Sequence, residues 1–212
     1  MLRRLRPHHD TRRARFALAA FLFLATAAVT FWQNAHVAVL WDLSYLLDSS
    51  DRFALGQVPY RDFPFAHAPL TFLLQATLIR VTGRVYWHHI VYAALAGAMG
   101  TLLTWRILYR LVERELLAAL LALPLTVVGI YCIYPHPIYD CDCVLAILFA
   151  LFLLQRANAA GPVGCFMTGA ALVPPLFFKQ NIGVVFFAST LAMVIALGFA
   201  DRSQRKSGRT GL

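Results

Sequence analysis

Two polar segments interrupt the apolar runs of this chain and carry the residue types that do chemistry. The first lies between residues 41 and 85 and contains Asp42, Tyr60, Arg61, Asp62 and His67. Carboxylates transfer protons as general acids or bases, and a guanidinium group binds anionic oxygens with two parallel hydrogen bonds. Simpler alternatives exist, because an Asp often caps a helix and Arg61 beside Asp62 could form an ordinary loop ion pair.

The second polar segment lies in the later part of the chain. The stretch Tyr134-Pro-His-Pro-Ile-Tyr-Asp140-Cys-Asp142-Cys carries two carboxylates at the start of an apolar run, and Lys179 stands between two further apolar runs. A charge in such a position is costly unless it reaches the membrane interface or a partner. Lys179 is therefore a candidate functional residue, with snorkelling to the surface as the simpler alternative.

The residue types of the second segment also raise the question of a metal. His136 and the four Asp and Cys residues at positions 140–143 are transition-metal ligand types, but ligands so close in sequence strain a single site. We expect no cofactor, with a divalent metal as the less favoured alternative. The four cysteines do not form a disulfide framework, because three of them flank this one stretch, and they are expected to pack as small apolar residues.

Long apolar elements must position these residues. Of 212 residues, 60% are hydrophobic and 14% are charged, whereas a soluble domain of this size needs more polar surface. The apolar residues come in long uninterrupted runs, as in membrane-spanning helices. The first run could also be a cleaved signal peptide, but apolar character resumes after it. The sequence predicts an all-α transmembrane fold with six spans, at about residues 16–32, 86–108, 116–134, 143–157, 162–178 and 181–200.

The basic residues gather on one side of these spans. If every span crosses the bilayer, 14 of the 19 Lys and Arg residues fall on one face, which the positive-inside rule makes cytoplasmic. We expect a multi-pass protein of the inner or plasma membrane, with residues 1–15 and 201–212 as basic cytoplasmic tails. The net charge of +9 does not indicate nucleic-acid binding, because no basic cluster is interleaved with stacking aromatic residues.

Within the transmembrane domain, residues 16–200, a long first outer loop covers residues 33–85. Apolar residues at positions 43, 46, 47, 53 and 54 have helical spacing, Gly56 is a natural stop, and Ser44, Asp48, Ser49 and Asp51 take the other face. Pro69 begins a second apolar segment, which is too short and too polar to cross and would invert all later spans if it did. The sequence predicts two helices lying in the outer interface.

Three motifs in this order resemble a known family. An acidic residue opens a helix after the first span, and Gly56-Gln-Val-Pro-Tyr-Arg-Asp62-Phe and His67-Ala-Pro-Leu70 follow it. An acidic position then lies in the next outer loop, and a lysine lies in a later outer turn, Phe178-Lys-Gln-Asn-Ile-Gly183. The order resembles that of GT-C glycosyltransferases, the cell-envelope membrane enzymes related to protein mannosyltransferases and lipid A aminoarabinose transferases (glycosyltransferase family 39-like). The resemblance covers the N-terminal half of that family.

The resemblance implies transfer of a sugar from a polyprenyl-phosphate donor to a lipid, glycan or protein acceptor at the outer face. Asp42 would be the general base, and Arg61 and Lys179 would bind the donor phosphate. The supporting residues would be Tyr60, Asp62, His67, Asp140 and Asp142, with the choice between the last two left open. The alternative is a non-catalytic polytopic membrane protein, namely a truncated family member, a small transporter or an assembly subunit.

Overall fold

All regular structure in the described part of this protein is helical. The computed structural model describes residues 9–157 and 161–207, and within these ranges no strand forms beyond a single bridge between Pro59 and Phe63. The helices are α1 (His9–His36), α2 (Leu40–Ala54), α3 (Leu70–Thr82), α4 (Trp87–Val112), α5 (Glu115–Ala122), α6 (Leu125–Val128), α7 (Tyr139–Leu154), α8 (Gly161–Ala171), α9 (Pro174–Phe178) and α10 (Gln180–Ser207). The predicted all-α fold is confirmed.

Four helical stretches are long and apolar enough to cross a membrane. They are Arg12–His36, Trp87–Val112, Gly161–Phe178, which joins α8 and α9, and Gln180–Ala200. The apolar stretch Glu115–Val128 and helix α3 are shorter. Residues 1–8 and 208–212 of the predicted basic tails lie outside the described residues, and the described parts of both tails continue α1 and α10.

Prolines interrupt two of the predicted spans. The third predicted span, 116–134, was too long, because Pro124 interrupts the helix and α6 ends at Val128. The fifth, 162–178, is broken before Pro174. A proline has no N–H to donate, and its ring clashes with the preceding turn. Residues 129–138 consequently form a link rather than the end of a span.

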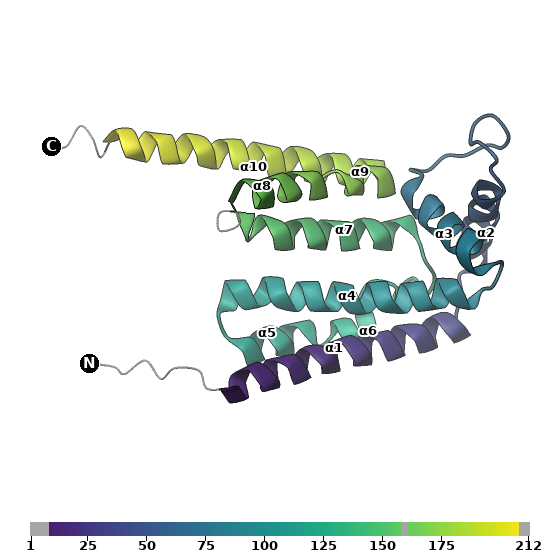
Figure 1. Cartoon of the computed structure of the whole chain (residues 1–212), viewed down its shortest axis with the longest axis horizontal. Coiled ribbons are helices and arrows are strands. Elements are labelled where there is room, and N and C mark those ends of the chain that lie inside the picture. Colours follow the sequence, from purple (N-terminus) through teal and green to yellow (C-terminus); the bar gives the residue numbers. More distant parts are fainter. Residues whose placement is uncertain (1–8, 158–160, 208–212) are drawn as a thin grey trace.

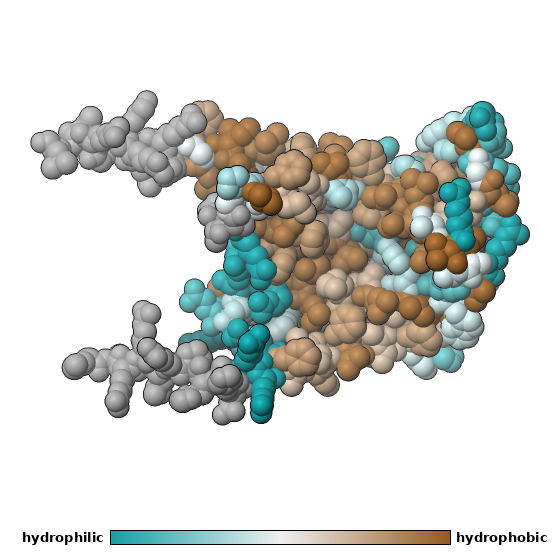
Figure 2. Space-filling model, viewed as in Figure 1, coloured by the Kyte–Doolittle hydropathy of each residue, from teal (hydrophilic) through white to brown (hydrophobic). Residues whose placement is uncertain are grey.

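The helices form a bundle with a lobe at one end (Figure 1). Helices α1, α4, α5, α6, α7, α8, α9 and α10 lie side by side, while α2 and α3 pack together beyond one end of them. The start of α1 and the end of α10 lie at the other end. Polar residues gather at these two ends, and an apolar band lies between them (Figure 2). A membrane protein needs such a band because hydrocarbon cannot solvate polar groups.

Small residues let the helices approach closely. A Cβ atom at Gly97 of α4 would lie 3.1 Å from the carbonyl oxygen of Ile130 and 3.2 Å from the Thr30 hydroxyl of α1. One at Gly183 of α10 would overlap the backbone of Pro175 in α9. Close backbone approach at glycines is a common way to pack helices within membranes. The contact at Gly183 holds α9, which Lys179 follows, close against α10.

Helices α2 and α3 enclose an aromatic core of their own. Leu46, Phe53, Phe63, Phe65, Phe72 and Ala76 form this cluster. Gly56, with a φ of +83°, follows the end of α2 as predicted, and Arg80 of α3 donates hydrogen bonds of 2.9 and 2.8 Å to the carbonyl oxygens of Ala54 and Phe53. Those carbonyls have no partner within their own helix, so Arg80 ties the two helices together.

One residue of α2 is not where the sequence pattern put it. Ser49 was predicted on the polar face, but it is buried, as is Ser50. Leu43 and Leu46 are buried as expected, whereas Asp48 is exposed and pairs with Arg52 at 2.8 Å. Small hydroxyl side chains fit a close helix contact, so the buried face of α2 is wider than its apolar residues indicate.

Candidate functional site

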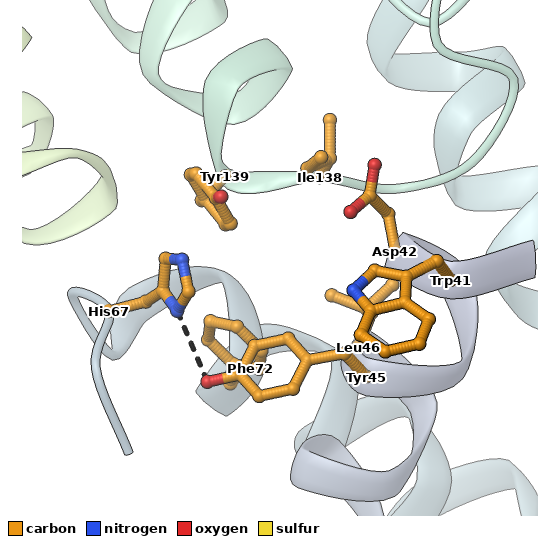
Figure 3. A pocket seen from close by; sticks show the side chains of 8 residues that line it. All are labelled: Trp41, Asp42, Tyr45, Leu46, His67, Phe72, Ile138 and Tyr139. Atoms are coloured by element: carbon orange, nitrogen blue, oxygen red, sulfur yellow. Dashed lines mark hydrogen bonds between the residues drawn. The ribbon is translucent and has the colours of Figure 1, made fainter. Parts of the chain in front are cut away.

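A cavity of about 310 Å³ lies where the α2–α3 lobe meets the bundle. Its walls come from α2, the link before α3, α3 itself and the start of α7 (Figure 3). The lining residues are Trp41, Asp42, Tyr45, Leu46, His67, Phe72, Ile138 and Tyr139. Most of the wall is aromatic or aliphatic, and only a few polar groups face the cavity. Such composition is typical of small-molecule sites.

Asp42 supplies the carboxylate of this cavity. The alternative that it caps a helix starting at Leu43 is wrong, because α2 already begins at Leu40 after an extended Val39 and has no side-chain cap. Asp42 instead lies in the first turn, and its carboxylate points toward Ile138 (Figure 3). No hydrogen bond or ion pair engages this carboxylate among the described residues. It is therefore available to a ligand.

His67 lies across the cavity from Asp42 (Figure 3). Its Nδ1 atom is 3.1 Å from the Tyr45 hydroxyl, and its ring centroid is 4.6 Å from that of Tyr139. Burial lowers the pKa of His67; the charges of Asp140 and Asp42 oppose that effect, while Lys179 reinforces it. The imidazole is accordingly neutral at pH 7 and can serve as a hydrogen-bond partner on the wall opposite the carboxylate.

Lys179 reaches the edge of the same site. It follows the end of α9, where its ammonium group forms an ion pair with Asp140 and lies 5.4 Å from the centroid of the Tyr139 ring. Lys179 is therefore paired in the protein rather than snorkelling free. An ammonium beside a cavity wall is a point charge that can hold an anionic oxygen.

Asp142 occupies a different environment from Asp140. Its side chain is 1% exposed and accepts hydrogen bonds from three hydroxyl groups: Thr71 at 2.6 Å, Tyr92 at 2.7 Å, and Tyr131. These donors belong to α3, α4 and the 129–138 link. Asp142 therefore joins three elements to α7 behind the cavity wall, and of the two carboxylates only Asp140 lies beside Lys179.

Arg61 and its neighbours do not join this cavity. They line a separate open hollow formed by residues 60–66. Arg61 donates two hydrogen bonds of 2.9 Å to Asp62, which also accepts the Val58 backbone N–H at 2.7 Å. The hydrogen bonds from Arg61 and then from Val58 lower the pKa of Asp62 to about 2. The loop ion pair is therefore present, and Tyr60 stands at a positive φ of 65° in the same turn.

The predicted site residues thus separate into two groups. The structure brings Asp42 and His67 to one cavity, and Lys179, paired with Asp140, lies 5.4 Å from the centroid of the Tyr139 ring in the cavity wall. The Arg61–Asp62 pair lies outside this cavity. Sequence reasoning missed the aromatic wall, in particular Tyr45 and Tyr139. Tyr45 could have been found, since it stands three positions after Asp42 and so shares its helix face.

No family model, curated protein or solved structure matches this chain. Within residues 9–157 and 161–207, no three His, Cys, Asp or Glu side chains are grouped so that they could hold a metal ion. All four cysteines are free; Cys132, Cys141 and Cys143 are buried, and Cys165 is exposed.

A buried histidine near the site gives a prediction on pH. His136 is fully buried, neither ring nitrogen has a partner among the described side chains, and burial lowers its pKa. Below pH 6.5 the His136 imidazole therefore binds a proton in the unfolded chain but stays neutral in the folded protein. Stability is complete above that pH and should fall by up to about 1.4 kcal/mol per pH unit as the pH drops toward the folded pKa.

The test compares the pH dependence of unfolding for wild type, His136→Phe and His36→Phe. The His136 variant should lose part of the acid-induced decline, while the exposed His36 should leave it unchanged. Burial also lowers the pKa of His67, so part of the decline in stability at low pH will remain in the His136 variant. An unchanged slope in His136→Phe would mean that this imidazole titrates normally in the folded state.

Proposed function

We propose that this protein is a GT-C-type membrane glycosyltransferase, which transfers a sugar from a polyprenyl-phosphate donor to an acceptor at the outer face of the membrane. The observation that carries the proposal is the Asp42 carboxylate, unpaired among the described residues, in an aromatic-lined cavity whose wall residue Tyr139 lies against Lys179 of the Lys179–Asp140 pair. The residues at this cavity come from the motifs that resemble the family in sequence. The cavity thus joins parts of the chain that are far apart in sequence.

The proposed topology has six crossings, with α2 and α3 in the outer interface. The stretch Glu115–Val128 and helix α7 measure only about 21 and 24 Å along their axes, short of a hydrocarbon core of about 30 Å. They run beside the longer helices, and α7 packs against both α4 and α9. Whether or not the stretch Glu115–Val128 and helix α7 cross the membrane, the number of crossings is even. Both ends of the chain therefore lie on one face of the membrane. The basic residues favour the cytoplasm for that face.

The chemistry of the proposed reaction requires few groups. A sugar on polyprenyl phosphate already carries a leaving group, so the enzyme must deprotonate the acceptor hydroxyl and stabilise the departing phosphate. Asp42 takes the first role in our proposal. Lys179 takes the second, since it lies at the cavity edge, whereas Arg61 would have to leave Asp62 to reach a phosphate there. The aromatic wall offers flat apolar faces for a sugar ring.

The test is transfer of labelled sugar by the purified full chain in lipid vesicles. The donors are a set of polyprenyl-phosphate sugars, with the matching nucleotide sugars as controls. We expect transfer from a lipid-linked donor and none from a nucleotide sugar. Transfer from nucleotide sugars alone would contradict the proposed donor class. Absence of both transfer and donor binding would favour the non-catalytic alternative.

A further inference from the structure

The end of the bundle opposite the α2–α3 lobe carries an open hollow of about 620 Å³. It lies between the last turn of α4 and the end of α7, and it is lined by Tyr109, Arg110, Leu111, Glu113 and Gln155. None of these residues belongs to the cavity around Asp42. The hollow is therefore a second concave site, at the face where α1 begins and α10 ends.

Arg110 lines this hollow, and Arg106 and Arg156 are its close neighbours. Arg110 of α4 donates a hydrogen bond to the backbone oxygen of Gln155, the residue that precedes Arg156. The guanidinium of Arg156 lies 3.9 Å from the centroid of the Phe152 ring, and its Nε atom is buried with no hydrogen-bond partner among the described residues. Arg106 stands one turn before Arg110 on the same face of α4, and the charges of both act on Arg156.

The acidic side chains described at this end do not neutralise these arginines. Glu115 pairs with Arg15 at 2.6 Å. Glu113 is the one carboxylate among the residues that line the hollow with Arg110, and no ion pair of Glu113 with an arginine forms among the described residues. Three like charges held together repel one another, and an anion bound between them relieves that repulsion. A buried guanidinium nitrogen with no partner is a donor directed to a group outside the described protein atoms.

We propose that this hollow binds the phosphate group of an anionic phospholipid in the cytoplasmic leaflet. Arginine suits a phosphate because its fork donates parallel hydrogen bonds to two oxygens. Leu111, which lines the hollow, is 69% exposed, so an acyl chain attached to the phosphate finds an apolar surface. Basic pockets between helices on the cytoplasmic side are a known mode of headgroup recognition. This proposal does not depend on the glycosyltransferase assignment.

The test measures binding of phosphatidylglycerol to the full chain in phosphatidylcholine nanodiscs. Wild type should prefer phosphatidylglycerol, and the double variant Arg110→Gln/Arg156→Gln should bind it about 25-fold more weakly, at about fivefold for each arginine. The matched control is Arg12→Gln/Arg13→Gln, which removes two exposed charges from the same end of the bundle. Its affinity for phosphatidylglycerol should stay close to that of wild type.

Two further measurements distinguish lipid binding from misfolding and from binding of free phosphate. Glu113→Gln removes the opposing carboxylate and should strengthen binding about fivefold, a gain that a misfolded protein cannot produce. Inorganic phosphate should fail to displace the lipid. Equal losses in the two arginine pairs would overturn the proposal in favour of general attraction to the basic face. Displacement by millimolar inorganic phosphate would identify the ligand as free phosphate and overturn the lipid assignment.

Discussion

Replacement of Asp42 by Asn is expected to lower sugar transfer by about 10²- to 10⁴-fold. The substitution keeps the size and shape of the side chain but removes its ability to accept a proton from the acceptor hydroxyl. The carboxylate makes no hydrogen bond or ion pair with the described residues, so its loss should leave the helix and the lobe intact. The fall should appear in kcat, with donor binding largely preserved, because a base acts only in the transition state.

Asp48→Asn is the matched control for this experiment. Asp48 belongs to the same helix and the change removes the same charge, but the side chain is exposed and pairs with Arg52 outside the cavity. Its transfer rate should stay within about twofold of wild type. Equal activity in Asp42→Asn and wild type, with both proteins inserted normally, would eliminate Asp42 as the base. Equal losses in the two variants would indicate a general effect of charge on the lobe.

The site was predictable from sequence as far as local spacing reached. Asp42 was singled out as the acidic residue that opens a helix after the first span, the position of the general base in the family that the sequence resembles. Its capping alternative failed because the apolar residues Leu40 and Trp41 extend α2 beyond the predicted start. Arg61 was assigned to the phosphate by resemblance alone. Because Arg61 is adjacent to Asp62 in the sequence, a loop ion pair was the simpler interpretation. The structure shows that ion pair.

Contacts between distant elements could not be predicted in the same way. Lys179 and Asp140 are far apart in sequence, and they meet because α7 packs against α9. Asp140 and Asp142 lie in different environments because of helix geometry, since residues two apart point about 200° away from each other around the helix axis. That rule says that the two carboxylates must face different surroundings. Only the packing of α3 and α4 against α7 decides which one is buried.

Long apolar helices were the most predictable part of the fold. Helices α1, α4 and α10 have runs long enough that pattern and structure agree. The shorter elements are less certain from sequence, because a few prolines can end a helix within a run that remains apolar. Pro124 and Pro174 do so here. The link that follows α6 then carries Tyr131 and His136 into the core, where the sequence had indicated the end of a span for Tyr131 and an outer loop for His136.

Asp142→Ala is expected to destabilise the protein by about 3–6 kcal/mol, because it leaves three buried hydroxyl groups without their acceptor. Thr71 and Tyr131 are fully buried, and Tyr92 is partly buried. Asp142→Asn should cost less, since its amide keeps an oxygen that accepts from the two tyrosines and an N–H₂ group that Thr71 can accept. The free energy of unfolding in detergent or bicelles measures both changes.

A double-mutant cycle separates the network from a general effect of truncation. Tyr92→Phe alone removes one hydrogen bond and should cost about 1 kcal/mol. If the hydroxyl groups left without an acceptor destabilise the Asp142→Ala protein, Tyr92→Phe should lower its free energy of unfolding little or not at all. Additive losses would show that the carboxylate and Tyr92 do not interact energetically. Asp142 would then stabilise α7 by packing alone, and the link that carries Ile138 to the cavity would be held by its other contacts.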